Sequence, residues 1–278
     1  MAARSVLFNI AFYLNFLIQA LVFAPALLLP RRFIWPIVRF WAGSSLWLHR
    51  MICGVGEEVR GSARLPQGGY LLACKHQSAW ETLRLVTLVP LPCFILKREL
   101  MWMPLFGWYL AKTGMIPVER GKRSRALEGI RQHAVRRLAE GRQVIIFPEG
   151  TRRLPGAEPA YKYGVTYLYD RLGVSCVPVA LNSGLYWPRR AWTHRRGTVL
   201  VEVLAPIEPG LPPAEFTTRL AQTIETHTNA LIGEALRQQP QLADSDVGNE
   251  TEPAESGRVS PAERPGTVGI DRPGQGSL

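Results

Sequence analysis

Residues 5–29 carry no charged side chain, and this apolar run limits the possible folds of the chain more than any other feature. A helix needs roughly 20 mostly apolar residues to cross a bilayer, and this run has 25. We therefore predict a membrane-associated helix near the start of the chain. A secretory signal peptide is one alternative, because Ala24-Pro25-Ala26 loosely resembles a cleavage site, but the apolar run continues beyond it. A buried helix of a soluble protein is the other, and the length of the run argues against it.

A second stretch, residues 33–55, mixes tryptophan and other apolar side chains with charged ones such as Arg39. This mixture suits the headgroup zone of a membrane, where indole rings and arginine side chains find both apolar and hydrated neighbours. Asn15 and Gln19 weaken a simple membrane-spanning interpretation of the first run. Together the two stretches predict a membrane-associated helical hairpin, residues 1–55, that enters or lies on one leaflet.

The formal net charge of +11 is unevenly distributed along the chain. Residues 239–278 hold seven acidic and three basic residues, so this segment carries −4 and the remainder of the chain +15. Such a surplus implies an anionic partner, namely nucleic acid, anionic lipid or a phosphorylated substrate. The apolar run favours membrane lipids, and no nucleic-acid recognition motif is present, so we expect no nucleic-acid partner. The acidic tail, rich in Pro, Glu, Ser and Gly, is predicted to be disordered.

The cysteines and most histidines show no spacing typical of metal or redox sites. We interpret the cysteines as buried thiols in a reducing compartment and predict no metal. The residues concerned are Cys53, Cys74, Cys93, Cys176, His49, His133, His194 and His227.

Residues 56–238 alternate short β-rich runs with segments of helical periodicity, which predicts an α/β catalytic domain. Nearly continuous apolar strands fit a mostly parallel central sheet flanked by helices. The expected strands are residues 70–75, 92–97, 114–118, 144–147, 174–181 and 198–204. The expected helices are residues 82–88, 103–112, 124–140, 161–172 and 214–238. Ligands of such a sheet bind at the carboxyl ends of its strands.

An unusual polar cluster, residues 75–81, directly follows the first of these strands. In it, His76 precedes Glu81 by five residues, which suits a general base and its orienting carboxylate if a turn brings them together. A purely structural alternative is a capping box, because Ser78 and Glu81 have its spacing. We do not expect one carboxylate orientation to serve both roles. His76 and Glu81 are the candidate catalytic pair, and Ser78 is interpreted as a helix cap rather than a nucleophile.

Three further polar clusters follow expected strands. Glycine lets backbone approach a ligand closely, and the planar arginine fork matches phosphate. Each basic side chain alone is more often a solvated surface charge, but clusters at four consecutive strand ends predict a binding site. Its candidate residues are Lys97, Arg120, Glu149, Gly150, Thr151 and Arg152.

These segments, in this order and at these separations, resemble the lysophosphatidic acid acyltransferase family of glycerolipid synthesis. Residues 76–81 resemble its first block, usually His-x-x-x-x-Asp, and residues 117–121 resemble the second. Residues 147–152 match the highly specific third block, and residues 177–180 the fourth. Glu81 stands where the family normally has aspartate, so its carboxylate, one methylene further out, needs a different rotamer.

The resemblance implies an O-acyltransferase of the 1-acylglycerol-3-phosphate type. Such an enzyme moves a fatty acyl chain from acyl-CoA or acyl-carrier protein to the sn-2 hydroxyl of lysophosphatidic acid and forms phosphatidic acid. His76 would take the hydroxyl proton and Glu81 would hold the imidazole. Lys97, Arg120 and Arg152 would bind the phosphate. No cofactor is implied.

The same resemblance implies a cell-membrane protein, in the inner membrane if the source is bacterial, with the catalytic domain facing the cytoplasm. Two alternatives remain open. In the first, the enzyme acts on another lysolipid, such as lyso-ornithine lipid. In the second, the chain is a non-catalytic lipid-binding relative of the enzyme.

Overall fold

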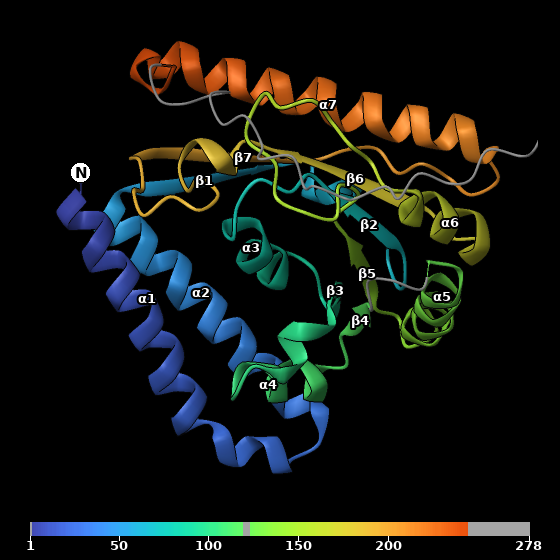
Figure 1. Ribbon diagram of the computed structural model, residues 1–278, viewed down its shortest axis with the longest axis horizontal. Coiled ribbons are helices and arrows are strands. Elements are labelled where there is room, and N and C mark those ends of the chain that lie inside the picture. The colour runs from blue at the N-terminus through green and yellow to red at the C-terminus, as the bar shows by residue number, and fades with distance from the viewer. Residues whose placement is uncertain (1, 119–122, 244–278) are drawn as a thin grey trace, which may run out of the picture. The chain divides into compact units, whose positions relative to one another are not determined.

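The structure is a computed structural model that describes residues 2–118 and 123–243. A seven-stranded sheet, in the order β1-β7-β6-β2-β5-β3-β4, runs through its centre (Figure 1). The strands are β1 (Val55–Arg60), β2 (Leu71–Cys74), β3 (Pro92–Lys97), β4 (Ile116–Val118), β5 (Gln143–Ile146), β6 (Cys176–Leu181) and β7 (Gly197–Val203). The helices are α1 (Ala2–Val22), α2 (Ile34–Cys53), α3 (Trp80–Leu88), α4 (Phe106–Thr113), α5 (Arg123–Ala139), α6 (Tyr163–Leu172) and α7 (Pro213–Gln238).

The sheet is mostly parallel, as predicted. Strands β6, β2, β5, β3 and β4 pair in parallel, whereas β7 runs antiparallel to β6 and pairs in parallel with β1. All six expected strands are present, and the predicted fold class is confirmed. Strand β1 was not expected, because only Val55 of this edge strand is fully buried and its residues show no apolar alternation.

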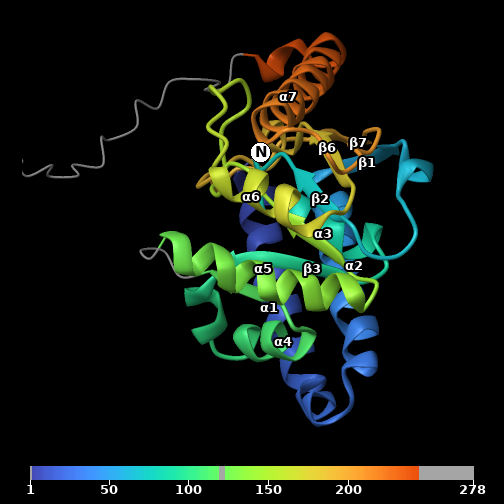
Figure 2. The same cartoon turned by 90° about the vertical axis from the view of Figure 1, so that its right-hand side faces the viewer.

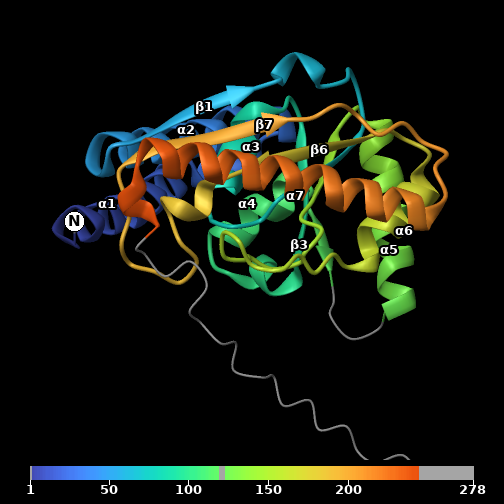
Figure 3. The same ribbon diagram turned by 90° about the horizontal axis from the view of Figure 1, so that it is seen from above.

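Both faces of the sheet are buried, which explains the continuous apolar strands. Leu71 and Ala73 of β2 pack in the cluster that α5, α6 and the first half of α7 cover, whereas Leu72 and Cys74 point to the opposite side. There they meet α2 and α3. Helices α5 and α6 lie side by side in Figure 2, and Figure 3 shows α7 crossing β6 and β7.

Helices α1 and α2 form the predicted hairpin, and Asn15 and Gln19 of α1 face α2. The Asn15 amide donates to Ser44 and Ser45 of α2 at 3.0 and 3.1 Å, and the Gln19 amide donates to Ser44 at 3.0 Å. Interhelical hydrogen bonds of this kind hold helices together in lipid. Because Asn15 and Gln19 bond to α2, they do not interrupt the apolar outer side of α1. By length and composition, α1 is long and apolar enough to cross a membrane.

An exposed apolar surface is formed by side chains of the hairpin and of residues 102–108, in and just before α4. Helix α4 packs against α1, where the Tyr109 hydroxyl donates to the Ala20 carbonyl at 3.1 Å. We call this surface the apolar face. It includes Val6, Leu7, Ile10, Leu14, Leu17, Ile18, Leu21, Leu28, Phe40, Trp47, Trp102, Met103 and Trp108.

Candidate active site

The predicted catalytic pair is in contact. His76 lies in the loop after β2, and Glu81 is the second residue of α3, so the turn between strand and helix brings the two side chains together. His76 Nδ1 lies 2.9 Å from Glu81 Oε1. The side chain of Glu81 is 1% exposed and that of His76 is 14% exposed, so only the imidazole of this pair is accessible to solvent.

The Glu81 carboxylate also receives three other hydrogen bonds. The backbone N–H groups of Gln77 and Ser78 donate to Oε1 at 2.8 and 2.7 Å, and the Ser183 hydroxyl donates to Oε2 at 2.7 Å. The Ser78 hydroxyl in turn accepts from the Trp80 N–H at 3.1 Å. The expectation that one carboxylate orientation would not serve both roles is therefore wrong, because Glu81 caps the start of α3 and holds His76 at once.

The imidazole of His76 is fixed from a second direction by Phe147, the first residue after β5. The two rings stack with centroids 3.9 Å apart and an interplanar angle of 16°. Because Nδ1 faces a carboxylate, the proton of the neutral imidazole lies on Nδ1, and Nε2 carries the lone pair. Among the described residues, Nε2 has no hydrogen-bond partner. This arrangement suits a general base.

The loop after β5 packs along the loop that carries His76. The Arg153 N–H donates to the His76 carbonyl at 2.8 Å, and the Lys162 N–H donates to the Pro148 carbonyl at 2.8 Å. Gly150 adopts a φ of +67°, a left-handed conformation that glycine takes without the penalty of a side chain. The turn at Gly150 and the hydrogen bond from Arg153 thereby hold the loop after β5 and the loop that carries His76 at the same edge of the sheet.

A buried ion-pair network lies behind the site. Lys75 Nζ donates to Glu149 at 2.9 Å and to both oxygens of Glu225 on α7 at 2.8 and 2.9 Å. The Tyr161 hydroxyl donates to Glu225 at 2.9 Å. Burial raises the pKa of Glu149, and the adjacent Lys75 ammonium opposes that shift. Glu149 is 0% exposed, so its carboxylate contacts this network rather than the surface of the site.

Comparison with known proteins agrees with the motif order and the geometry. Residues 57–182 match the family described as Acyltransferase. A 1-acyl-sn-glycerol-3-phosphate acyltransferase of Pseudomonas aeruginosa is 36% identical over 167 residues, which cover 60% of this chain and 65% of that protein. Residues 57–182 are therefore similar to the acyltransferase family.

Two more relatives are similar at lower identity. The human 1-acyl-sn-glycerol-3-phosphate acyltransferase alpha is 29% identical over 168 residues, covering 59% of each chain. A lyso-ornithine lipid O-acyltransferase of P. aeruginosa is 29% identical over 215 residues, covering 71% of this chain and 81% of that one. The chain thus spans about two thirds or less of the length of the glycerophosphate relatives.

A solved structure shares the fold of this chain. The crystal structure of the 1-acyl-sn-glycerophosphate acyltransferase from Thermotoga maritima aligns with a TM-score of 0.68 at 20% sequence identity. The alignment covers 82% of this chain and 97% of that chain, so the similarity extends beyond the residues that the family match includes.

The residues predicted from sequence to bind the acceptor lie near the carboxyl ends of neighbouring parallel strands. Lys97 is exposed at the end of β3, and Arg152 is half-buried in the loop after β5, where its carbonyl accepts from Arg189 at 2.8 Å. Thr151 is half-buried and Gly150 is exposed in the same loop. Arg120 lies outside the described residues. Strand β5 pairs with both β2 and β3, so these loops share one edge with His76.

Sequence reasoning missed Ser183, Lys75, Tyr161 and Glu225. Ser183 follows β6 by two residues, and the rule that selected the other strand ends would have selected it too. Tyr161 and Glu225 are 64 residues apart, and no local pattern links them to each other.

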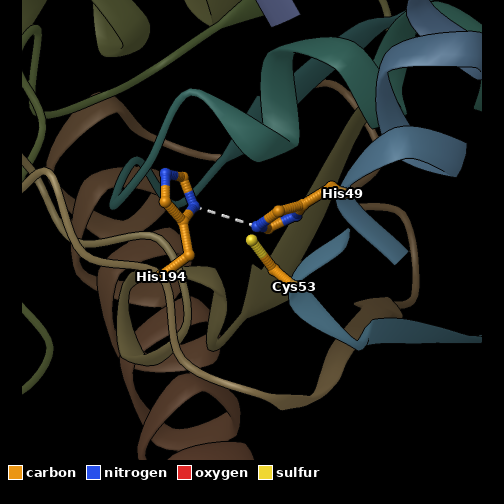
Figure 4. Close-up of side chains that lie close together, drawn as sticks. All are labelled: His49, Cys53 and His194. Carbon is orange, nitrogen blue, oxygen red and sulfur yellow. Dashed lines mark hydrogen bonds between the residues drawn. The ribbon is translucent and has the colours of Figure 1, made fainter. Parts of the chain in front are cut away.

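Sequence reasoning also assigned no role to three buried residues that the fold brings together, His49, Cys53 and His194 (Figure 4). Burial, and secondarily the proximity of His194, lowers the pKa of His49 to about 3, and burial lowers that of His194 to about 4. Burial raises the pKa of the Cys53 thiol to about 11. The spacing of four residues between His49 and Cys53 on one helix was the available signal.

Proposed function

We propose that this protein transfers a fatty acyl chain from acyl-CoA or acyl-carrier protein to the sn-2 hydroxyl of lysophosphatidic acid. The observation that carries the proposal is the contact between His76 and Glu81, with Nε2 of the imidazole unpaired within the described residues. This is the arrangement that a general base requires. The similarity to glycerophosphate acyltransferases supports the choice of acceptor.

In the proposed reaction His76 Nε2 takes the proton of the acceptor hydroxyl while its oxygen attacks the thioester carbonyl carbon. Glu81 stabilises the imidazolium that forms, because its carboxylate lies against Nδ1. The carbon–sulfur bond then breaks, and the imidazolium returns its proton to the departing thiolate. The new ester and the free thiol of the carrier are the products, and His76 is regenerated without a covalent acyl-enzyme.

The acceptor's phosphate would be bound by basic residues at the same edge of the sheet. Lys97 is the last residue of β3, Arg152 lies in the loop after the neighbouring strand β5, and Arg120 belongs to the same predicted group. Glu149 would then act indirectly, by holding Lys75 and the loop that carries Gly150, Thr151 and Arg152. Lyso-ornithine lipid, which has no phosphate, is the second candidate acceptor. The similarity to a lyso-ornithine lipid O-acyltransferase favours it.

The protein associates with membranes through its N-terminal hairpin, and we propose that the catalytic domain faces the cytoplasm, at the inner membrane in a bacterium. The four cysteines are buried free thiols, which suits a reducing compartment.

Near the hairpin turn, a cavity of about 420 Å³ is lined in part by Arg31, Arg32, Arg39 and Arg142. Their charge would attract anionic headgroups. Protease digestion of right-side-out and inverted membrane vesicles tests the orientation, since only inverted vesicles should expose a cytoplasmic domain.

Release of free thiol from acyl-CoA and from acyl-carrier protein tests the function. The full-length protein in mixed micelles is assayed with lysophosphatidic acid, with lyso-ornithine lipid and with no acceptor. We expect acceptor-dependent release that His76→Ala reduces by roughly 10²-fold to 10⁴-fold. His133→Ala is the matched control, because His133 is an exposed histidine of α5 whose ring contacts the Gly129 carbonyl.

Two further variants distinguish lysophosphatidic acid from lyso-ornithine lipid as the acceptor. Lys97→Ala and Arg152→Ala should raise the KM for lysophosphatidic acid and leave the KM for lyso-ornithine lipid nearly unchanged. No thiol release with any donor and acceptor pair, from protein that binds lipid and unfolds cooperatively, would favour a non-catalytic lipid-binding protein.

A further inference from the structure

The junction between the N-terminal hairpin and the loop from β6 to β7 contains three side chains of the types that bind zinc. His49 and Cys53 lie on one face of α2, and His194 lies in the loop. One donor atom from each residue lies within 4.8 Å of the others, and all three residues are buried. Figure 4 shows the three side chains pointing toward one another. We propose that His49, Cys53 and His194 bind one zinc ion.

The donor set is selective for this class of metal. Imidazole nitrogen and thiolate sulfur suit zinc, whereas calcium and magnesium prefer oxygen ligands. Two ligands four residues apart on a helix lie on the same face, and a third from a distant segment completes a set that holds two parts of a chain together. Here the third ligand, His194, is 145 residues from His49 along the chain.

A neighbouring amide orients His194 for this role. The Asn9 side chain donates through its Nδ2 to the Trp192 carbonyl at 3.2 Å, so its Oδ1 faces His194 Nε2 at 3.4 Å. The His194 proton therefore lies on Nε2, and the lone pair of Nδ1 points to His49, 3.0 Å away. Metal-binding histidines commonly donate their other N–H to such an acceptor, which fixes the ring.

Zinc binding requires one change of tautomer and the loss of one proton. In the metal-free chain, His49 Nε2–H donates to His194 Nδ1. Zinc between these atoms bonds to both nitrogens, so the His49 proton moves to Nδ1 of the same ring. The Cys53 thiol releases its proton as the zinc–sulfur bond forms. Two nitrogens and one sulfur leave the fourth tetrahedral position to water or another oxygen ligand.

The two nitrogens need only a small adjustment, whereas the sulfur, which lies within 4.8 Å of them, has to move closer. Zinc–nitrogen bonds of roughly 2.0–2.1 Å place two tetrahedral nitrogen ligands roughly 3.3 Å apart, a few tenths of an ångström more than the present separation. The Cys53 sulfur is held weakly, with the Arg4 carbonyl at 3.8 Å as its hydrogen-bond partner, so it can rotate toward the ion.

The ion would hold the hairpin on the catalytic domain. Ser5 and Asn9 of α1 and His49 of α2 already contact His194. The loop that carries His194 also contains Ser183, whose hydroxyl donates to Glu81. Zinc at this junction therefore stabilises the attachment of the membrane-associated hairpin to the segment beside the candidate active site.

Metal binding is tested on the full-length protein, purified without a histidine tag, stripped with chelator and kept reduced without thiol reagents. Co²⁺ is the spectroscopic probe and Zn²⁺ the competitor. We expect one Co²⁺ per chain, a near-ultraviolet thiolate-to-cobalt absorption band, about one proton released per Zn²⁺ bound, and loss of the band when Zn²⁺ is added. Zn²⁺ should also raise the Tm.

Three variants make the test specific. Cys53→Ser should lose the absorption band and the Tm shift, and Asn9→Ala should weaken Co²⁺ binding by about 10-fold to 100-fold. Cys93→Ser, which removes a buried cysteine of β3, should keep all wild-type responses. The proposal is overturned if the wild type binds no stoichiometric metal, if Cys53→Ser keeps the band, or if Cys93→Ser loses it. Those outcomes would leave His49 and His194 as a hydrogen-bonded pair beside a buried thiol.

Discussion

Glu81 has two structural tasks that depend on the same carboxylate. One oxygen accepts from His76 and from two backbone N–H groups at the start of α3, and the other accepts from the Ser183 hydroxyl. Both carboxylate oxygens are engaged, Oε1 by three donors and Oε2 by one, so moving the side chain away from His76 would break several hydrogen bonds. The longer side chain that replaces the family's usual aspartate is therefore fully engaged in this structure.

We expect Glu81→Gln to lower kcat by roughly 10²-fold or more, because a neutral amide stabilises the imidazolium poorly. It should also lower the Tm, because the carboxylate that caps α3 is lost. Glu81→Asp should fall between the wild type and Glu81→Gln, although it restores the residue usual in the family. Its carboxylate retreats by about 1.5 Å, too far to keep all four hydrogen bonds. Thiol-release kinetics and thermal unfolding measure both effects, and wild-type kinetics for Glu81→Asp would contradict this account.

Among the elements, β2, the loop after β5 and α7 meet at Lys75. Its side chain is 2% exposed, and its ammonium group lies against the carboxylates of Glu149 and Glu225. Removing it leaves two carboxylates facing each other inside the protein. We expect Lys75→Met to lower the free energy of unfolding by about 3–5 kcal/mol, as breaking a buried ion pair does. Denaturant unfolding measures this loss. Lys112→Met, which alters an α4 lysine whose side chain has no ion pair among the described residues, should change it little.

Glu128 of α5 forms a hydrogen bond with Tyr167 of α6, and its ionisation affects the stability of the fold. The Arg131 guanidinium and the Gln132 and Tyr167 side chains donate to Glu128 and lower its pKa to about 2. The folded state therefore favours the ionised form, and this contribution is present above the unfolded pKa of about 4.5 and lost as the pH falls toward 2. We expect Glu128→Gln to destabilise the protein at pH 7 and to match the wild type near pH 2. Urea unfolding across this range at low salt would show it, and a pH-independent difference would argue against it.

The helices and strands of the domain could be predicted from sequence because their signals are local. Continuous apolar runs marked the strands of the parallel sheet, and the strand-end rule led to His76, Glu81 and Arg152. The edge strand β1 had too little buried surface to leave such a pattern. Contacts such as Ser183 with Glu81, 102 residues apart, depend on the strand order, which local periodicity does not encode.

For the whole molecule, the apolar face sets where the protein resides. Leu14 and Ile18 of α1 are 50% and 57% exposed, and no described residue covers them fully. We expect Leu14→Lys with Ile18→Lys to weaken binding to anionic vesicles by at least 10-fold, since each apolar side chain is worth about 1.5–3 kcal/mol on burial. Vesicle co-sedimentation measures this. Val135→Lys, which alters an exposed apolar residue of α5, should bind vesicles like the wild type.

The apolar face also changes what substrate concentration means for this protein. Under the proposed function, a hairpin held at a lipid surface confines the candidate site to two dimensions, where it would meet lysolipid by lateral diffusion rather than from bulk solution. The rate then follows the number of acceptor molecules per unit area of the surface. Adding inert phospholipid to mixed micelles, at constant total acceptor, slows each protein molecule by surface dilution alone.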